Sequence, residues 1–547
     1  MSRRCRLPLA IFFLLSCAPH AARAATLSRE LEQRLPTLRE GEGLRVVLQF
    51  ADRVDLSRFR DGRKEAPDLI RALRATSARS QGRALSFLAA RGATDVRSFW
   101  INNSIAVRAT GPLLLELTGF EEIATIDVDQ PVGFTDGGPA PGAVQAVEWN
   151  LTITGIDQVW STFGLDGAGI VVGSMDTGFD PAHPALAGKW RGGTNSWTDI
   201  INGLPAPYDD HGHGTHTIGT MVGGDGPGPF ATDIGVCYGA TFISAKVLDA
   251  TNSFSDASIV IAGAQWMLDP DGDPQTNDFP HVINNSWFFF SAIYTGFHST
   301  IAAWRAAGIV PVFCIGNFGP TAQTTRVPGS YNNTLGIGAT TSADAIASFS
   351  SRGPSPSGST WFPADRRKPD LSAPGDFVLS SVPGGGYQQW SGTSMASPHV
   401  AGTVALMLQA NPDLTFDEIR QTLEASAVDL GAVGYDYDFG YGRLNALAAL
   451  NQVVGVPVAA PAPRALVAAP NPFSSGVRFL AGSPAGPVAL DLFDVQGRRV
   501  WTAAAAPGEP IVWDGRDRNG LPLPAGAYWA RATSGGLRWT QRVVRLD

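Results

Sequence analysis

The chain has 547 residues, which is too long for one ordinary domain, and 44% of them are hydrophobic against 16% charged. This balance excludes an intrinsically disordered protein. The formal net charge is -8, and Arg366-Arg367-Lys368 is the one basic block that stands out. The sequence therefore gives no indication of a nucleic-acid-binding surface.

The N-terminus has the pattern of a secretory signal peptide. A positively charged start precedes the apolar stretch Leu7 to Ser16, which is too short to span a bilayer as a mature helix, and Ala22-Arg23-Ala24 resembles a small-x-small cleavage site. An alternative is that Leu14-Leu15-Ser16-Cys17 is a bacterial lipoprotein signal, which would leave Cys17 lipidated. We therefore assign residues 1–24 to a signal peptide and expect a secreted or extracellular protein, with attachment to the cell surface as the alternative.

Two cysteines, Cys237 and Cys314, remain beyond that segment. They could form one disulfide in an oxidising compartment, but a domain of this size does not need one, and Cys314 lies in an apolar strand pattern. The sequence therefore favours two buried thiols.

Residues 25–140 are predicted to form a small α/β domain. The pattern is an apolar strand, a helix, two paired strands, a short helix and a last strand, which is the β-α-β-β-α-β order of ferredoxin-like domains. Gly and Pro cluster between Pro131 and Val147, which predicts the domain boundary there, and no feature of the sequence fixes a cleavage site in it. The predicted elements are Leu44 to Phe50, Asp68 to Arg91, Val96 to Ile101, Ser104 to Ala109, Pro112 to Leu117 and Glu122 to Val128.

Residues 145–454 alternate apolar strands with helical patterns, which predicts an α/β domain whose parallel sheet is covered on both faces. Three polar residues, Asp176, Ser286 and Asn317, follow strands of this set, so we expect them at the C-terminal edge of the sheet, where open α/β sheets gather their sites. The predicted strands are Ile170 to Met175, Thr241 to Val247, Val282 to Asn285 and Ile309 to Ile315, and the predicted helices are Ser255 to Leu268 and His298 to Ala307.

Three short motifs in this region supply a candidate serine nucleophile and its base. Ser394 follows a Gly-Thr turn and begins a helix, so unpaired backbone N–H groups lie beside its hydroxyl. A serine hydroxyl is a weak nucleophile at neutral pH and needs a base that is held by a carboxylate. His213 is the candidate base, and Asp176, at the end of an apolar strand, is the candidate carboxylate. The order Asp, His, Ser is the subtilisin order and differs from those of chymotrypsin and the α/β-hydrolases.

The blocks Met175 to Gly178, His213 to Thr220 and Gly392 to Gly402 resemble the three motifs of the subtilisin-like serine peptidases. The resemblance covers about Trp149 to Leu450 and implies an α/β fold with a subtilisin-like doubly wound parallel sheet. It also implies an endopeptidase that hydrolyses polypeptide substrates through an acyl-enzyme, with no cofactor for the chemistry. By the same resemblance, residues 25–140 are an inhibitor-type propeptide that helps the peptidase fold, occupies its cleft and is then cut away.

The resemblance also assigns roles around the cleft. The side-chain amide of Asn317 would stabilise the oxyanion together with the backbone N–H of Ser394. The segment Ser286-Trp287 would pair its backbone with an extended substrate. Where the family has small glycines after this Trp, the chain has Phe288-Phe289-Phe290, and these rings could narrow or fill the primary specificity pocket.

Each of these residues also has an ordinary structural interpretation. Taken singly, Asp176 or Asn317 could be a turn residue and Ser394 a helix N-cap. Three histidines of one loop could mimic a metal site, although no zinc-peptidase helix accompanies them. These three are His211, His213 and His216. By resemblance, His216 and His399 are structural neighbours of the catalytic residues.

The loop Asp269 to Asp278 concentrates carboxylates between a helix and the next strand. Calcium prefers oxygen-rich loops of this kind, but the spacing does not match an EF-hand. A structural Ca2+ and a solvated loop both remain open, and the metal content is unknown from the sequence. Together with Asn284-Asn285-Ser286-Trp287, this loop resembles the bacillopeptidase F branch of the family.

Residues 455–470 have the composition of a semi-rigid Pro/Ala linker, and residues 471–547 have the short alternating strands of a small β-sandwich. This last region resembles the immunoglobulin-like module of the flagellar hook-capping family and also the sorting domains of type IX export. It could contact the secretion machinery or the cell surface, or it could be a plain spacer.

Two functions remain open from the sequence. The first is a secreted serine endopeptidase made as a zymogen, monomeric, with its own propeptide as an intramolecular inhibitor. The alternative is a catalytically silent surface or binding protein that keeps the subtilisin fold while the Phe-rich segment blocks its cleft. The presence of all four candidate catalytic residues favours the enzyme.

Overall fold

The computed structural model describes residues 25–60, 62–135, 137–141, 147–224, 234–250, 255–357, 360–455, 466–469, 471, 473–480, 487–506, 509–534 and 537–546. The chain divides into two compact units between Gly455 and Val456. The predicted signal peptide at 1–24, including Cys17, lies outside the described residues, as do residues 456–465 of the predicted linker. Within the described ranges, no helix is both long enough and apolar enough to cross a membrane.

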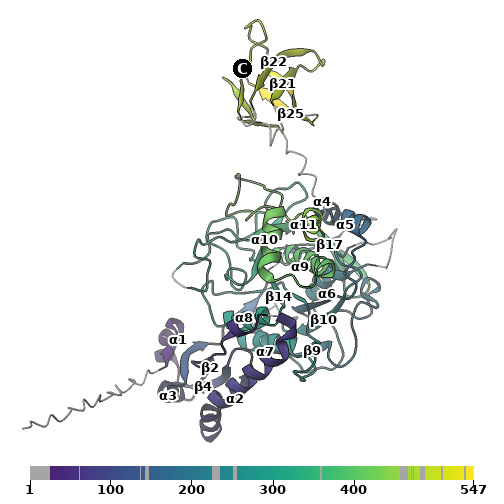
Figure 1. Cartoon of the computed structure of the whole chain (residues 1–547). Coiled ribbons are helices and arrows are strands. Elements are labelled where there is room, and N and C mark those ends of the chain that lie inside the picture. The colour runs from purple at the N-terminus through teal and green to yellow at the C-terminus, as the bar shows by residue number, and fades with distance from the viewer. Residues whose placement is uncertain are drawn as a thin grey trace, which may run out of the picture. The chain divides into compact units, whose positions relative to one another are not determined.

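The N-terminal domain is a mixed five-stranded sheet with three α-helices that connect its strands (Figure 1). The predicted order β-α-β-β-α-β is present, and a short strand is added at the edge of the sheet, parallel to the last one. The sequence does not predict this added strand because two residues are too few to show a period of two. The strands β1 (Thr26–Leu27), β2 (Gly43–Phe50), β3 (Thr94–Phe99), β4 (Ser104–Thr110) and β5 (Ile123–Val128) lie in the order β1-β5-β2-β4-β3, with helices α1 (Arg29–Arg34), α2 (Ala66–Ala90) and α3 (Gly111–Leu117).

The second domain is built on a seven-stranded sheet in which every neighbouring pair is parallel, and this confirms the predicted α/β fold class. The sequence analysis does not predict the strands at 335–340 and 371–374, because their glycines, alanines and proline weaken the strand signal. The sheet order is β16 (Leu371–Pro374), β15 (Leu335–Thr340), β14 (Val310–Cys314), β12 (Val282–Asn285), β8 (Val171–Asp176), β10 (Thr241–Lys246) and β9 (Trp197–Asp199).

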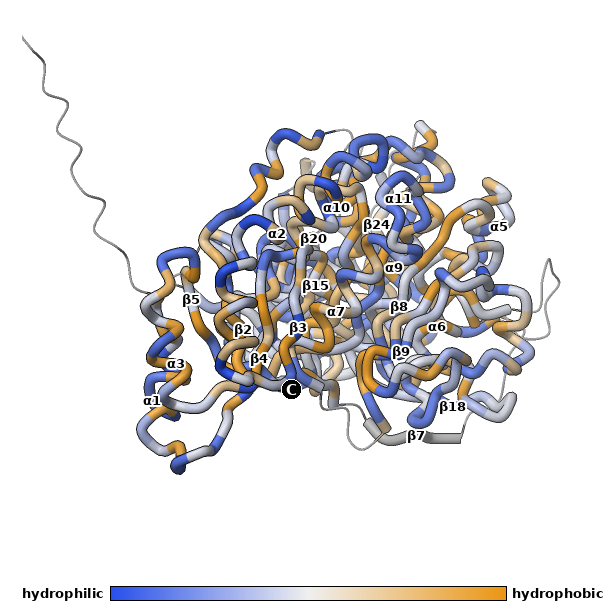
Figure 2. The backbone as a smooth tube through the Cα atoms, turned by 90° about the horizontal axis from the view of Figure 1, so that it is seen from below, coloured by the Kyte–Doolittle hydropathy of each residue, from blue (hydrophilic) through white to orange (hydrophobic). Residues whose placement is uncertain are grey.

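Consecutive residues of the central strands enter two different hydrophobic cores, because side chains alternate across a strand. In β12, Val282 enters the first core and Ile283 the second, and in β14 Val312 and Phe313 divide in the same way. Cys237 and Cys314 are both buried thiols, as predicted. Hydrophobic stretches gather around α7 and the nearby strands, whereas hydrophilic stretches run along the outer loops (Figure 2).

Helices cover both faces of this sheet. Ile218 of α6, Val400 of α9 and Ile419 of α10 lie in the first core, whereas Val260 of α7 and Ile301 of α8 lie in the second. The sheet is therefore buried on both faces, as near-continuous apolar strands require. The helices are α4 (Trp149–Thr154), α5 (Ile156–Phe163), α6 (His213–Val222), α7 (Ala257–Leu268), α8 (His298–Ala306), α9 (Thr393–Ala410), α10 (Phe416–Ser426) and α11 (Ala446–Val453).

The N-terminal domain packs against α7 and α8 of the second domain (Figure 1). Asp129 accepts hydrogen bonds from the backbone N–H of Ser258, at 2.8 Å, and from its hydroxyl, at 2.6 Å. A carboxylate at this position satisfies a donor of the first turn of α7 and complements the helix dipole. Gln265 of the same helix accepts a hydrogen bond of 2.7 Å from the backbone N–H of Trp100. The two domains therefore share both a core and a polar interface.

The C-terminal unit contains two antiparallel sheets around one apolar core, which agrees with the predicted β-sandwich pattern. Residues 467–469, which their composition assigns to the linker, form an edge strand because their backbone pairs with the next strand. One sheet has β19 (Val467–Ala469), β20 (Val477–Leu480) and β23 (Ile511–Trp513), and the other has β22 (Arg499–Ala505), β21 (Val488–Phe493), β24 (Gly526–Ser534) and β25 (Leu537–Arg545).

Two helical glycines give a matched test of this packing. A Cβ atom at Gly402 of α9 would lie 2.6 Å from Cβ of Val236, whereas nothing lies within 4 Å of a Cβ at Gly82 of α2. We expect Gly402→Ala to lower the free energy of unfolding by about 1–3 kcal/mol through overpacking. Gly82→Ala should raise it by about 0.5–1 kcal/mol through helix propensity. Urea unfolding in a Ser394→Ala background measures both, and equal effects would contradict the packing of α9.

Candidate active site

Asp176 and His213 meet where β8 ends and α6 begins. His213 Nδ1 lies 2.6 Å from Asp176 Oδ1, and both side chains are buried. The same carboxylate accepts hydrogen bonds from the backbone N–H of Thr177, at 2.7 Å, and from Thr217 Oγ1, at 3.2 Å. An ionised carboxylate accepts only, so His213 Nδ1 carries the proton and Nε2 is left with its lone pair in the neutral ring.

Asp209 anchors the first turn of α6, which carries His213. Its carboxylate accepts hydrogen bonds from the backbone N–H groups of His211, Gly212 and Thr215 and from the hydroxyls of Thr177 and Thr215, at 2.6 to 3.1 Å. Burial acts to raise the pKa of Asp209, but the hydrogen bonds, led by that from the Thr215 hydroxyl, hold the pKa below its usual value. The Asp209 carboxylate is therefore ionised, and in this form it stabilises the start of α6.

The start of α6 lies so close to the segment after β8 that there is no room for a side chain. A Cβ atom at Gly214 would lie 2.1 Å from the carbonyl oxygen of Gly178. The helix can therefore approach the end of the strand only because residue 214 is glycine. This close approach is what brings the imidazole of His213 to Asp176.

Ser394 lies in the first turn of α9, as predicted, and the helix contains Pro398. Because proline has no N–H, it cannot donate to the carbonyl of Ser394 four residues earlier. The Ser286 hydroxyl donates to that carbonyl instead, at 2.8 Å, and Ser394 Oγ donates to the Ser286 carbonyl at 3.3 Å. The predicted neighbour at the sheet edge, Ser286, thus ties the end of β12 to the start of α9.

Asn317 joins the start of α9 to the N-terminal domain. Its Oδ1 accepts hydrogen bonds of 2.8 Å from both the backbone N–H and the hydroxyl of Thr393. The amide is thereby oriented so that Nδ2 donates to the carbonyl oxygen of Thr135. The sequence analysis leaves Thr135 in the boundary region, and the structure brings its carbonyl beside the residue that precedes Ser394.

The end of the N-terminal domain lies in the cleft as an extended strand. β6 (Pro131–Gly133) pairs antiparallel with β11 (Ser255–Asp256) on one side and with β13 (Phe288–Phe289) on the other. Gly133 is the register partner of Phe288. The chain therefore enters the cleft by main-chain pairing, which suits an extended peptide of any sequence.

The chain is also held beyond Asp136, which itself lies outside the described residues. β7 (Gly137–Pro141) pairs antiparallel with β18 (Gly386–Ser391), whose other neighbour is β17 (Val378–Val382). The partner of Gly137 is Ser391, three residues before Ser394. Backbone pairing thus holds the chain on both sides of the peptide bond between Thr135 and Asp136.

The strand that pairs with β6 is Phe288 and Phe289, two residues further along the chain than Ser286-Trp287, where the sequence places pairing with a substrate. The side chain of Trp287 is buried in the second core, where it contacts Phe297 and Phe313 at ring-centroid distances of 5.5 and 5.4 Å. Trp287 and Phe289 lie in this core together, with ring centroids 5.9 Å apart. The side chain of Trp287 is therefore structural.

The Phe-rich segment pairs with β6 through its backbone and packs its rings against neighbouring residues. Phe289 is buried in the core, and Phe288 packs edge to face against Phe318, with ring centroids 5.2 Å apart. The guanidinium of Arg326 lies over the Phe318 ring at 4.0 Å. These side chains fill space next to Asn317 while the backbone of Phe288 still pairs with Gly133. The effect of the segment on the primary specificity pocket stays a prediction.

The model of the subtilase family matches residues 167–442, which contain Asp176, His213, Asn317 and Ser394. The chain belongs to the subtilase family. Subtilisin from Bacillus pumilus is 34% identical to it over 289 residues, which are 52% of this chain and 92% of that protein. This subtilase is thus a subtilisin-like serine peptidase.

Two further relatives from Bacillus subtilis (strain 168) show how far the similarity extends. Bacillopeptidase F is 34% identical over 422 residues, which are 70% of this subtilase but only 28% of bacillopeptidase F. Serine protease AprX is 35% identical over 295 residues, which are 48% of this subtilase and 61% of that protein. The alignment with bacillopeptidase F is thus longer than the family domain, and most of that relative has no counterpart here.

The other predicted histidines have structural partners. His216 Nε2 lies 3.1 Å from the carbonyl oxygens of Val378 and Gln388, so it donates a proton there. His399 Nδ1 lies 2.8 Å from the Met395 carbonyl. Burial lowers the pKa of His216 to about 3 and that of His399 to about 4, so both rings are neutral near pH 7.

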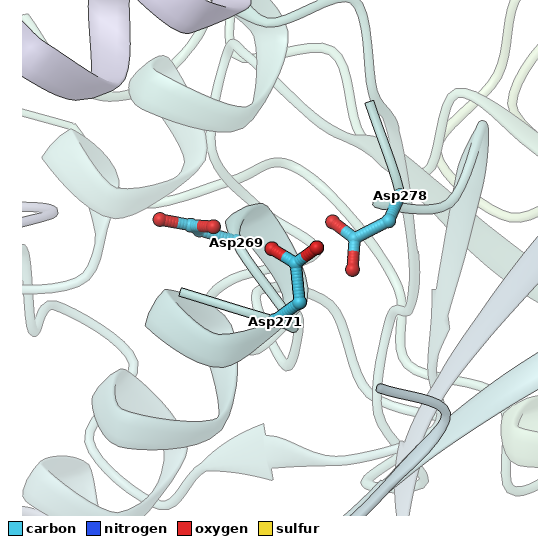
Figure 3. Close-up of side chains that lie close together, drawn as sticks. All are labelled: Asp269, Asp271 and Asp278. Carbon is cyan, nitrogen blue, oxygen red and sulfur yellow. The ribbon is translucent and has the colours of Figure 1, made fainter. Parts of the chain in front are cut away.

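Three carboxylates of the predicted calcium loop converge beyond the end of α7 (Figure 3). Ligand oxygens of Asp269, Asp271 and Asp278 all lie within 4.8 Å of one another. Arg74 of the N-terminal domain pairs with Asp269 and donates to the Gly272 carbonyl at 3.1 Å. Burial raises the pKa of Asp269 to about 6, although Arg74 acts to lower it. The set suits a hard cation, and an arginine of the N-terminal domain supplies positive charge to it.

The sequence analysis misses two residues that hold the site. Asp209 lies four residues before His213, and an acidic residue just before a helix start is a recognisable capping signal. Lys246 ends the apolar strand β10, and its buried ammonium donates to the Thr177 carbonyl and to Asp210, both at 2.6 Å. A single lysine inside an apolar run is a signal for a buried cation.

Asp209 gives a pH-dependent prediction. Its pKa is lower in the folded state than in the unfolded chain, so its contribution to stability is complete above pH 4 or so and is lost as the pH falls through the folded-state value. We expect Asp209→Asn to lower the free energy of unfolding by about 2–3 kcal/mol at pH 7. The difference from the parent protein should shrink below about pH 3.5.

Urea titrations of the Ser394→Ala protein, with and without Asp209→Asn, measure this difference. Asp413→Asn, at an exposed position on another loop, is the matched control and should have no effect. A difference that is independent of pH would contradict the anionic role of Asp209.

Proposed function

We propose that this subtilase is an endopeptidase made as a zymogen and that it matures by cleaving its own peptide bond between Thr135 and Asp136. The observation that carries this proposal is the hydrogen bond from Asn317 Nδ2 to the Thr135 carbonyl oxygen. An amide donor aimed at one carbonyl, beside a serine at a helix N-terminus, is the arrangement that stabilises a tetrahedral oxyanion.

In the proposed mechanism Ser394 Oγ attacks the carbonyl carbon of Thr135 while His213 Nε2 takes the hydroxyl proton. Asp176 holds the Nδ1 proton of His213 and stabilises the imidazolium. The negative charge passes to the Thr135 oxygen, which Asn317 and the backbone N–H of Ser394 stabilise. His213 then gives its proton to the departing amine of Asp136. Water hydrolyses the resulting ester by the same steps and regenerates Ser394.

The N-terminal domain would then remain as an inhibitor. Arg45 contacts Asp256 at 2.9 Å and Ser258 Oγ at 3.2 Å, so the domain is held on α7 and β11 independently of the scissile bond. Cleavage alone breaks none of these contacts. Active enzyme therefore appears only after the domain dissociates or is degraded, and polypeptide substrates then take the place of β6.

The proposal extends to location and partners. The signal-peptide pattern at 1–24 supports secretion, with attachment at the cell surface as the alternative. The long alignment with bacillopeptidase F supports the assignment to that branch. The two sheets of the C-terminal unit support an immunoglobulin-like module that contacts the export machinery or the cell surface. We propose a monomer, since one chain contains all the groups of the site.

If Ser394 is the nucleophile, its replacement should remove both probe labelling and self-cleavage. Ser394→Ala should abolish labelling by a fluorophosphonate probe and leave the chain uncleaved at Thr135, because the attacking hydroxyl is absent. Gel analysis and N-terminal sequencing measure both, and the mature wild-type protein should begin at Asp136. Ser397→Ala, one turn further along α9, is the control and should be labelled and processed.

Different outcomes would contradict different parts of this proposal. Labelling of the Ser394→Ala protein would exclude Ser394 as the nucleophile. A wild-type N-terminus elsewhere than Asp136 would exclude Thr135 as the cleavage position while leaving the peptidase intact.

We further propose that a structural Ca2+ binds Asp269, Asp271 and Asp278 after the N-terminal domain has left. The Asp269 side chain is 1% exposed, and its Oδ1 makes no hydrogen bond within the described residues, so one ligand atom is buried and available. Departure of Arg74 would leave three carboxylates without its charge. A divalent cation would then compensate the negative charge of three carboxylates that lie close together, one of which is buried.

Calcium removal should therefore lower the stability of the processed protein more than that of the uncleaved Ser394→Ala protein. We expect millimolar Ca2+ to raise the Tm of the processed protein by several degrees over EDTA, through preferential binding to the folded state. Asp271→Asn should remove most of this shift, whereas Asp273→Asn, outside the trio, should retain it. Equal Tm values with Ca2+ and EDTA would contradict a calcium site.

A further inference from the structure

The strand in the cleft also carries information about substrate preference. Phe134 lies between the paired strand β6 and Thr135, whose carbonyl oxygen is bound by Asn317. The register of this segment is fixed on both sides of Phe134, by the pairing of Gly133 with Phe288 and by the Asn317 contact. The ring of Phe134 therefore marks where the side chain of the second residue before the cut is seated.

We propose that the cleft has a subsite for an aromatic side chain at the second position before the cut, formed by His213 and His211. This inference rests on the proposed function, and it specifies the substrates as polypeptides with Phe, Tyr or Trp at that position. Phe134 stacks on the His213 ring with centroids 3.8 Å apart and an interplanar angle of 12°. It meets the His211 ring edge to face at 5.1 Å and 81°.

Trp390 of β18 completes the wall of this subsite. Its ring lies 5.9 Å from His211 and 6.0 Å from His213, so each imidazole has an aromatic neighbour as well as Phe134. Trp390 is itself buried against Met395 and Val378. Both histidines thus contact Trp390 as well as Phe134, and Phe134 is only 7% exposed.

The geometry favours an aromatic ring over an aliphatic side chain of equal size. Stacked and edge-to-face arrangements use the quadrupole of the π-system, which an aliphatic ring lacks. In the proposed mechanism His213 becomes an imidazolium in the transition state. A ring 3.8 Å from it then gains a cation–π attraction that is absent in the ground state. Interactions that strengthen only in the transition state raise kcat, so the preference should appear in turnover as well as in binding.

Four peptide p-nitroanilides test this preference with the processed full chain. Each copies residues 132–135 as acetyl-Val-Gly-Xaa-Thr, with Phe, cyclohexylalanine, pentafluorophenylalanine or Ala as Xaa. Cyclohexylalanine matches the size of Phe without a π-face, and pentafluorophenylalanine matches its shape with the quadrupole reversed. We expect kcat/KM for Phe to exceed that for Ala by at least tenfold or so through apolar burial. It should exceed that for the other two by roughly 2- to 10-fold, mostly in kcat.

Variants at the exposed His211 locate the preference in the subsite. His211→Ala should lower the Phe-to-Ala ratio of kcat/KM by roughly threefold, because the edge contact is lost. His211→Phe should restore the ratio, since a phenyl ring can make the same contact. Val433→Ala, at a position 98% exposed, is the matched control and should leave the ratio unchanged.

The possible outcomes separate this inference from the function on which it rests. Equal kcat/KM for Phe and cyclohexylalanine, or an unchanged ratio in His211→Ala, would overturn the aromatic subsite while the peptidase stands. Protein that is labelled by the fluorophosphonate probe but hydrolyses none of the four peptides would also overturn it. Failure of labelling would overturn the proposed function and the subsite together.

Discussion

The hydrogen bond between Asp176 and His213 is the interaction on which the rest of the site depends. Both groups are buried, and a buried carboxylate is costly unless each oxygen is satisfied. Thr177 and Thr217 supply the remaining donors, and Asp209 and Lys246 hold the backbone on either side. These contacts hold the strand end and the helix start together, and Asp176 orients the imidazole of His213.

The same chain supplies both the enzyme and an occupant of its cleft. Backbone pairing of β6 with β11 and β13 makes no demand on side chains, so it can hold any extended peptide. Selectivity must then come from the positions where side chains are enclosed. Phe288, Phe318 and Arg326 pack against one another next to Asn317, which binds the Thr135 carbonyl. The rings of His211 and His213 contact the side chain of the preceding residue, Phe134. The Phe-rich segment thus contributes both a paired backbone and packed rings beside β6.

Local pattern was sufficient for much of the fold. The strands around Val171–Asp176, Val282–Asn285 and Val310–Cys314 have near-continuous apolar runs, and the edge predicted for them does gather Asp176, Ser286 and Asn317. The strands β15 and β16 escaped prediction because their small residues carry little hydrophobic signal. The sequence places substrate pairing at the backbone of Ser286-Trp287, whereas the backbone of Phe288 and Phe289 pairs with β6 and the Trp287 side chain lies in the core.

The sequence by itself determined the fold class, the order of the three motif residues and the two buried thiols, because these depend on residue type and local spacing. Only the tertiary structure decided which boundary residue reaches Asn317, which ring covers His213, and which arginine meets the carboxylates after α7. Those contacts join positions roughly 80 to 200 residues apart. No local period encodes them, because they depend on how the N-terminal domain packs against the second domain, with which it shares a core.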